Sequence, residues 1–294
     1  MTYNHKLIND LAWTIGSASL LDNFPFKDER LKTSKWYNEQ LLDCKQLLDA
    51  QDKSPHLIQS YLSDMTSFRL GHYFEKLIAY WLLINPRFEI VHNNLVINQD
   101  KRTIGEIDFI IRDLYHNKTI HLEVAVKFYL QVKQDERSYW FGTNLNDRLD
   151  LKMDKLFNKQ IELSNNEIAK EELAKQGIEI DDHWVIIKGR LFSKRNELIN
   201  NSWFTNKEFS RLANDSKWII LDKSFWLADA TNIDYNFLTS DIYNRSEITD
   251  IVTNKNNSRP LCVAEVINNR ESKRIFITPE NWNQQALDTL IEKT

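Results

Sequence analysis

The sequence predicts an α/β fold in which helices pack on a mixed central sheet. Apolar residues recur with a helical period over 57–85 and then alternate over 88–130, where three segments rich in β-branched residues are separated by short polar turns. A further strand-like segment, 183–192, follows a long helical stretch, as a crossover between parallel strands requires.

The N-terminal part of the chain is predicted to be helical. Leucines recur at three- and four-residue spacing within residues 5–50, which is typical of helices with one apolar face. Ser54 and Pro55 supply the N-cap and first turn of the next helix, and Pro86 ends that helix because proline disfavours helical geometry in the residue before it. We therefore expect a helical segment over 1–56.

Three strands are expected next, at 88–97, 103–111 and 119–130. The loops between them are short, so the strands are predicted to form an antiparallel meander. Residues 144–163 return to a helical pattern before the strand at 183–192.

The remainder of the chain has short strand-like segments and a terminal helix over 279–293. We therefore predict a core over 57–195, followed by a small α+β extension over 196–294.

Composition excludes several classes of protein. The 294 residues carry a net charge of −4, so binding of nucleic acid would need a local basic surface. No phosphate-binding glycine motif is present, and we expect no nucleotide or organic cofactor. The two cysteines are too few and too far apart for a disulfide framework or a CxxC metal site. No signal peptide or transmembrane segment is recognisable, which predicts a cytoplasmic protein that does not contact membranes.

Two predicted strands carry acidic residues among valines and isoleucines. Strict alternation over 119–130 gives one apolar face and one face with charged residues, consisting of His121, Glu123, Ala125, Lys127 and Tyr129. If this strand pairs with 103–111, Asp108, Glu123 and Lys127 converge on one patch of the sheet. The alternative is an ordinary solvated face. His121 shares the face of Glu123 and is expected to be exposed.

Two adjacent carboxylates repel each other, and a divalent cation between them relieves the repulsion. Ligation by Asp and Glu oxygens alone favours Mg²⁺ or Mn²⁺ over zinc. Such an ion can clamp a phosphodiester oxygen and activate water, and a nearby lysine can orient that water. The pattern therefore points to metal-dependent hydrolysis of phosphodiesters.

Five segments together carry a resemblance to a known family: "LINDLAWTIGSASLL", "RLGHYFEKLIAYWL", "GEIDFIIRD", "HLEVAVKFYL" and "NDRLDLKMDKL". The chain resembles the bacterial domain-of-unknown-function family 1853, which has been grouped with the PD-(D/E)XK nuclease superfamily. The resemblance implies a restriction-endonuclease-like core. It also implies Mg²⁺ or Mn²⁺ bound by Asp108 and Glu123, Glu75 on the preceding helix as an auxiliary carboxylate, and Lys127 as the catalytic lysine.

The sequence departs from the superfamily pattern at the lysine. The usual Glu-x-Lys spacing would place it at position 125, where this chain has Ala125. Lys127 lies on the same face, roughly 6.6 Å further along an extended strand.

Basic residues in two stretches are the candidates for contacting nucleic acid, namely Arg148 and Lys152, then Lys188, Arg190, Lys194 and Arg195. Tyr139, Trp140 and Phe141 would stack on bases if exposed and fill the core if buried. The sequence thus predicts a magnesium-dependent nuclease acting on DNA or RNA. The alternative is a catalytically inactive PD-(D/E)XK-like module that binds nucleic acid or a protein partner. Strandedness, sequence specificity and oligomeric state are left open.

Overall fold

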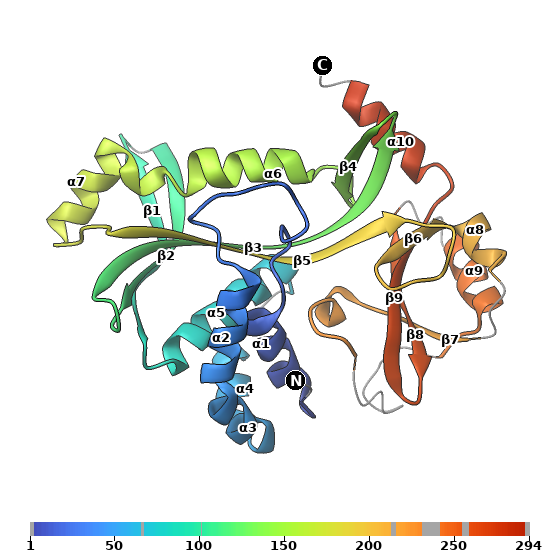
Figure 1. Cartoon of the computed structure of the whole chain (residues 1–294), viewed down its shortest axis with the longest axis horizontal. Coiled ribbons are helices and arrows are strands. Elements are labelled where there is room, and N and C mark those ends of the chain that lie inside the picture. The colour runs from blue at the N-terminus through green and yellow to red at the C-terminus, as the bar shows by residue number, and fades with distance from the viewer. Residues whose placement is uncertain are drawn as a thin grey trace.

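The computed structural model describes residues 3–65, 68–100, 102–212, 216–230, 242–254 and 259–291. It confirms a mixed α/β architecture, with one large sheet in the strand order β1-β2-β3-β5-β6-β9-β8-β7 and β4 paired to β3 (Figure 1). No helix within these ranges is long and apolar enough to cross a membrane.

The first half of the sheet is the predicted meander. Strands β1 (Phe88–Gln99), β2 (Arg102–Asp113) and β3 (Lys118–Gln134) pair antiparallel, and β4 (Arg137–Gly142), which the sequence pattern did not indicate, adds a hairpin to β3. Strand β5 (Asp182–Lys194) lies parallel to β3, which confirms the predicted mixed sheet.

Glycine is required at position 189 of β5, which lies opposite Lys127 of β3. Its φ is +142°, and a Cβ atom there would lie 1.7 Å from the carbonyl oxygen of Lys127. Only glycine therefore fits where β5 passes Lys127.

Helices cover both faces of β3 and β5 (Figure 1). On one side lie α1 (Lys6–Gly16), α2 (Ser34–Asp43), α3 (Lys45–Lys53), α4 (His56–Leu62) and α5 (Leu70–Ile84). On the other side lie α6 (Leu149–Lys155), a π-helical turn (Leu156–Gln160), a 3-10 turn (Leu163–Asn165) and α7 (Glu167–Lys175). The single helix predicted from Ser54 to Pro86 is wrong, because α4 ends at Leu62 and α5 begins only at Leu70.

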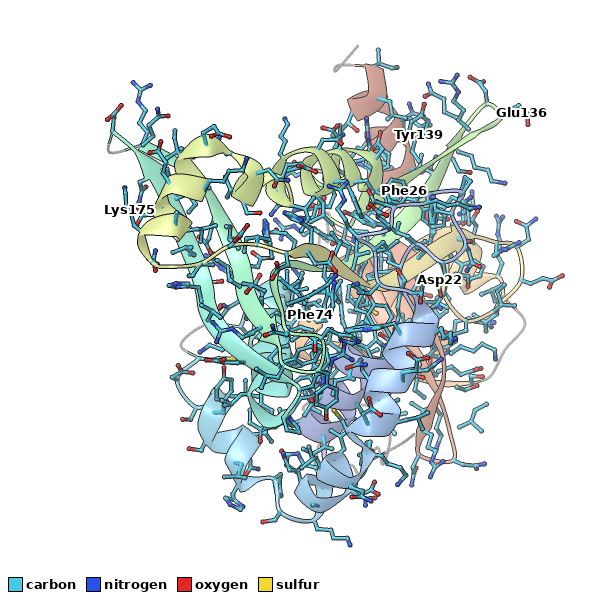
Figure 2. The ribbon with its side chains drawn as sticks, turned by 60° about the vertical axis from the view of Figure 1, so that its left-hand side comes forward. Asp22, Phe26, Phe74, Glu136, Tyr139 and Lys175 are labelled. Carbon is cyan, nitrogen blue, oxygen red and sulfur yellow. The ribbon has the colours of Figure 1, made fainter. Side chains whose placement is uncertain are left out.

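The alternation along β3 decides which cluster each of its side chains joins. Val124 and Val126 pack in a large core cluster with Phe74 of α5, whereas Ala125 and Tyr129 pack in a second cluster with Leu156 and Phe157 under α6, against which Phe26 also packs (Figure 2). The face that could have been solvated is therefore covered.

The C-terminal part continues the same sheet. Its strands are β6 (Ser202–Thr205), β7 (Lys217–Ile220), β8 (Leu261–Ile267) and β9 (Arg270–Thr278), and its helices are α8 (Asn206–Ser210), α9 (Arg245–Asn254) and α10 (Trp282–Ile291). Trp203, Phe276 and Trp282 belong to the large core cluster that also contains α1 and α5, so apolar packing is continuous across residue 195.

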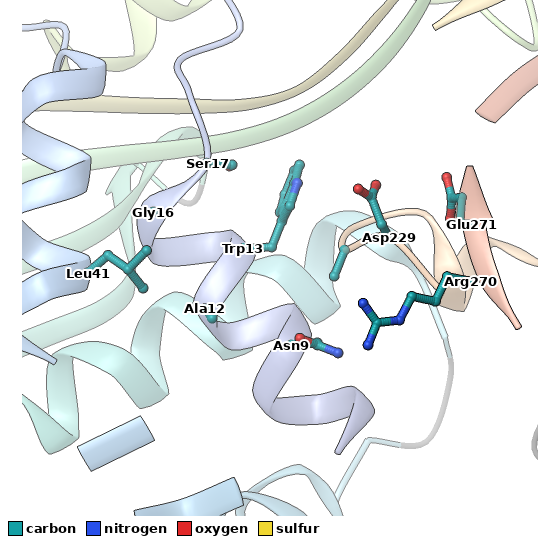
Figure 3. A pocket seen from close by; sticks show the side chains of 10 residues that line it. Asn9, Ala12, Trp13, Gly16, Ser17, Leu41, Asp229, Arg270 and Glu271 are labelled. Carbon is teal, nitrogen blue, oxygen red and sulfur yellow. The ribbon is translucent and has the colours of Figure 1, made fainter. Parts of the chain in front are cut away.

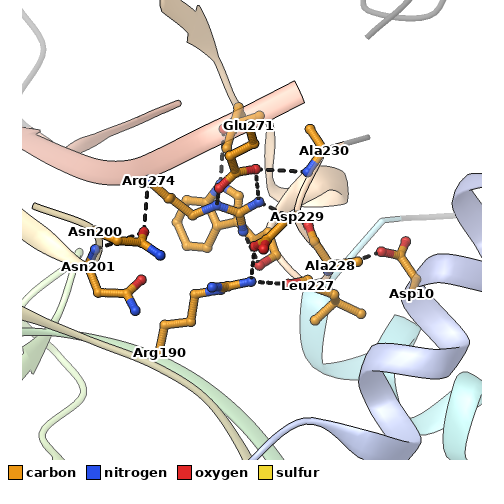
Figure 4. A network of polar contacts seen from close by, with 12 residues as sticks. Asp10, Arg190, Asn200, Asn201, Leu227, Ala228, Asp229, Ala230, Glu271 and Arg274 are labelled. Atoms are coloured by element: carbon orange, nitrogen blue, oxygen red, sulfur yellow. Dashed lines mark hydrogen bonds and ion pairs between the residues drawn. The ribbon is translucent and has the colours of Figure 1, made fainter. Parts of the chain in front are cut away.

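A buried polar network joins this part to the N-terminal helices (Figure 4). The fully buried Arg274 of β9 donates to the carbonyl oxygens of Trp226 and Ala228 and pairs with Glu271. The backbone N–H of Ala228 in turn donates to Asp10 of α1 at 3.3 Å. The chain around Ala228 thus connects α1 to the C-terminal strands.

Candidate functional site

The candidate site lies where β2 and β3 part. Their backbone pairing runs from Asp113 opposite Lys118 to Phe109 opposite Leu122 and goes no further. At the next positions, side chains replace the ladder: the N–H of Asp108 donates to Glu123 Oε1 at 3.3 Å, and the N–H of Val124 donates to Asp108 Oδ2 at 2.9 Å. The structure therefore brings Asp108 and Glu123 together, each carboxylate held by the backbone of the opposite strand.

Burial makes this pair electrostatically unusual. Glu123 is fully buried and Asp108 half-buried. Burial, together with the charge of Glu123, raises the pKa of Asp108 to about 7, and burial raises the pKa of Glu123 to about 7 as well. Near neutral pH the pair accordingly tends to keep a proton that exposed carboxylates would have lost.

A lysine and a glutamine reach the pair from the helix above it. Gln160, at the end of the π-helical turn, donates to Glu123 Oε2 at 3.0 Å, and Lys152 of α6 donates to Gln160 Oε1 at 2.8 Å. The pKa of Lys152 is lowered, chiefly by burial and then by the charge of Lys127, and the charges of Asp108 and Glu123 oppose this shift. Lys152 is thus linked to Glu123 through Gln160, and the charges of Asp108 and Glu123 act on its ammonium group.

Lys127 is on the predicted face of β3 but has a different partner. Its ammonium forms an ion pair with Asp147 at 2.5 Å, and Tyr129 donates to the other oxygen of the same carboxylate at 3.0 Å. Within the described contacts, Lys127 is held by Asp147 and not by the pair it was predicted to join.

Glu75 approaches the site from α5. Burial raises its pKa, and the charges of Asp108 and Glu106 raise it further. Its nearest ionic partner is His72, at 3.8 Å. No group of three or more His, Cys, Asp or Glu side chains able to hold a metal ion occurs within the described ranges, so Glu75 does not complete a three-ligand set with Asp108 and Glu123.

His121 corrects an expectation. It was predicted to be exposed, but it is fully buried, and burial lowers its pKa to about 3. Its Nε2 lies 3.1 Å from Glu123 Oε1. Alternation placed His121 on the face of Glu123, but nothing in the sequence showed that the turns after α6 cover this end of the strand.

The basic stretch at the end of β5 does not form one surface. Lys188 is fully buried, donates to the carbonyl oxygens of Ile15 and Ser17, and lies 3.2 Å from the ring centroid of Tyr37. Burial therefore removes Lys188 from the residues available to a phosphate backbone.

The other predicted basic residues differ in availability. Arg190 pairs with Asp229 in the network of Figure 4, Lys194 pairs with Glu208, and Arg148 pairs with Asp150, whereas Arg195 is exposed. Each of the three paired residues would have to exchange its carboxylate partner before binding phosphate.

One cavity, of about 550 Å³, is lined by residues that include Ser164, Leu173 and Ile178. Two smaller cavities also lie outside the carboxylate pair. One, of about 250 Å³, is lined by residues that include Phe24, Tyr139, Trp140 and Met153. Phe141, the third aromatic residue of this segment, is buried. The other, of about 370 Å³, lies between α1 and the start of β9 and is lined by residues that include Trp13, Asp229 and Arg270 (Figure 3). Neither cavity is lined by Asp108 or Glu123.

Comparison with known proteins gives one match. The model of a family described as "Domain of unknown function (DUF1853)" matches residues 9–278. No curated protein and no solved structure matches the chain significantly.

Proposed function

We propose that this chain, which belongs to the DUF1853 family, is a metal-dependent nuclease built on a PD-(D/E)XK-like core. The observation that carries the proposal is the buried pair of Asp108 and Glu123, set side by side where two strands part. Two adjacent buried carboxylates cost free energy to ionise, which makes such a pair a candidate functional site.

The donor set fits a hard divalent cation. Both donors are carboxylates, and the pKa of each is raised by burial, so a cation that replaced the shared proton would relieve their repulsion. Asp108 and Glu123 would hold Mg²⁺ or Mn²⁺, which when bound supplies Lewis acidity to a phosphodiester.

Lys152 takes the part that the superfamily pattern gives to the strand lysine. Its ammonium donates to Gln160, which in turn donates to Glu123, and from this position we infer that Lys152 orients a water molecule or neutralises charge developing on phosphorus. Ala125 packs in the same apolar cluster as Leu156 and Phe157. A small side chain at the usual lysine position therefore packs in one cluster with the π-helical turn that carries Gln160.

The test is a cleavage screen with single- and double-stranded DNA and RNA in Mg²⁺ or Mn²⁺. Asp108→Ala and Glu123→Ala should abolish cleavage, because each removes one of the two proposed ligands. Lys152→Met should lower kcat by about 10²-fold, and Lys127→Met should lower it less. Glu89→Ala, which removes an exposed carboxylate on β1, is the matched control. Cleavage that survives both Asp108→Ala and Glu123→Ala would refute the assignment.

A second candidate function is a catalytically inactive relative of the same core that binds nucleic acid or a protein partner. Ala125 at the usual lysine position and the ion pair of Lys127 with Asp147 favour it. Calorimetric titration of Mg²⁺ and Mn²⁺ into the wild type and Asp108→Ala separates the two proposals. Salt-dependent binding of nucleic acid without binding of either cation would support the inactive module.

A further inference from the structure

A chain of hydrogen bonds leads from Glu123 to His183, at the start of β5. Nε2 of His121 lies 3.1 Å from Glu123 Oε1, and Nδ1 of the same ring lies 2.8 Å from Oγ of Ser164. The hydroxyl of Ser164 lies 3.0 Å from Nε2 of the half-buried His183. Ser164 is itself buried, so its hydroxyl has to find its partners within the protein.

Three elements bring these groups together. In the parallel pairing of β3 with β5, His121 lies directly opposite His183. Ser164 comes from the 3-10 turn Leu163–Asn165. The turn lies against β2, where the end of the Leu163 side chain is close to Gly105.

The chemistry of the groups favours one direction for the chain. A neutral imidazole has one N–H donor and one acceptor nitrogen, and an ionised carboxylate only accepts. When Glu123 is ionised, as a ligand must be, Nε2–H of His121 donates to it and Nδ1 must accept. The hydroxyl of Ser164 supplies that proton, and its oxygen accepts from Nε2–H of His183.

We propose that His121, Ser164 and His183 are positioning residues for Glu123. The hydroxyl of Ser164 holds His121 in the Nε2–H tautomer, and His121 then keeps the Glu123 carboxylate in place beside Asp108. Without that hydroxyl the ring is free to carry its proton on Nδ1, which would turn a nitrogen lone pair toward the carboxylate oxygen. The part of this inference that concerns cation binding rests on the proposed function, whereas the tautomer can be read in the metal-free protein at a pH at which Glu123 is ionised.

The experiment compares wild type with Ser164→Ala and with Ser164→Thr, which restores a hydroxyl. Ser202→Ala is the matched control, because Ser202 is also fully buried and donates to a backbone carbonyl, that of Ile199, at 2.6 Å. Long-range ¹H–¹⁵N correlation spectra report which ring nitrogen of His121 carries the proton, and calorimetry reports the affinity for Mn²⁺.

All spectra are recorded at pH 9, where Glu123 is ionised, and under this condition we expect the proton of the wild-type His121 ring on Nε2. Ser164→Ala should give a mixture of tautomers and bind Mn²⁺ about tenfold more weakly, as is usual when a group that orients a ligand is lost. Ser164→Thr should restore both properties, and Ser202→Ala should change neither. A purely structural role for Ser164 would alter stability without moving the tautomer.

Two results would overturn the inference: a proton on Nδ1 of His121 in wild type, or an unchanged tautomer in Ser164→Ala. Failure of the proposed function is a separate outcome, in which wild type neither binds Mn²⁺ nor cleaves nucleic acid. In that case the tautomer still decides, since a change on removing the Ser164 hydroxyl supports the positioning chain and no change overturns it.

Discussion

Replacing Asp108 by asparagine should stabilise the protein at pH 8. The asparagine side chain mimics a protonated aspartate: its oxygen can accept from the N–H of Val124, and its amide can donate to Glu123. The variant thus removes the need to ionise a carboxyl group that is half-buried beside another carboxylate.

The magnitude follows from the pKa. That of Asp108 is raised to about 7 in the folded protein, whereas an unfolded chain has about 3.9, and each unit is worth about 1.4 kcal/mol. The ceiling is therefore roughly 4 kcal/mol, and partial solvation and coupling to Glu123 reduce it to about 1–2 kcal/mol. For a chain of this size the melting temperature should rise by about 2–6 °C.

The effect should depend on pH with a definite sign. Between about pH 4 and pH 7 the folded state retains a proton on Asp108 that the unfolded state has released, so wild-type stability falls as pH rises through this window. Asp108→Asn lacks this carboxyl group, so its stability should fall less over the same pH range. The stabilities of the two proteins should differ most at pH 8 and least near pH 4.

Urea unfolding followed by circular dichroism between pH 4 and pH 8 measures this difference. Glu89→Gln is the control, because it removes an exposed carboxylate and should change stability by at most about 1 kcal/mol. Mg²⁺ should stabilise wild type and not Asp108→Asn, if the pair holds a cation. An Asp108→Asn variant that is less stable than wild type at pH 8, or a difference that does not vary with pH, would refute the reasoning.

Three further substitutions test other parts of the structure by urea unfolding. In wild type, burial lowers the pKa of Lys188, so the unfolded state binds more protons and the free energy of unfolding should rise with pH toward about 10. Lys188→Met should flatten this rise. Wild type and variant with the same dependence of unfolding free energy on pH would contradict the prediction. Arg274→Lys should lower the free energy of unfolding by about 3 kcal/mol, because an ammonium group cannot replace a guanidinium that contacts Trp226, Ala228 and Glu271 together. Arg270→Lys, at the exposed end of β9, is the control and should hardly change the stability. Gly189→Ala should lower the free energy of unfolding by at least about 3 kcal/mol, because the added Cβ would overlap the carbonyl oxygen of Lys127. Gly177→Ala, at φ +70° in open space, is the control and should cost only about 1 kcal/mol. Similar losses for both would show that the overlap with Lys127 does not cause the destabilisation.

The period of the sequence was enough to predict much of the sheet. Alternation along β3 assigned its apolar side chains to one face, and these side chains lie in the core. The short turn between β2 and β3 made an antiparallel pair the natural arrangement, which in turn placed Asp108 beside Glu123. These features are local, because a strand has a side-chain period of two and a short loop leaves its neighbours few ways to pair.

The surroundings of that pair were decided by tertiary structure. Lys152 and Gln160 lie about thirty residues or more beyond Glu123 in the sequence, and they reach the carboxylates only because α6 and the π-helical turn pack on the second face of the sheet. The same packing buries His121, and the N-terminal helices bury Lys188. A periodic pattern determines which side chains share a face, but the burial of that face depends on elements distant in the chain. The sequence by itself therefore determined that two carboxylates lie side by side. Only the tertiary structure decided that Lys152 and Gln160 reach them from another helical segment and that His121 is buried against Glu123.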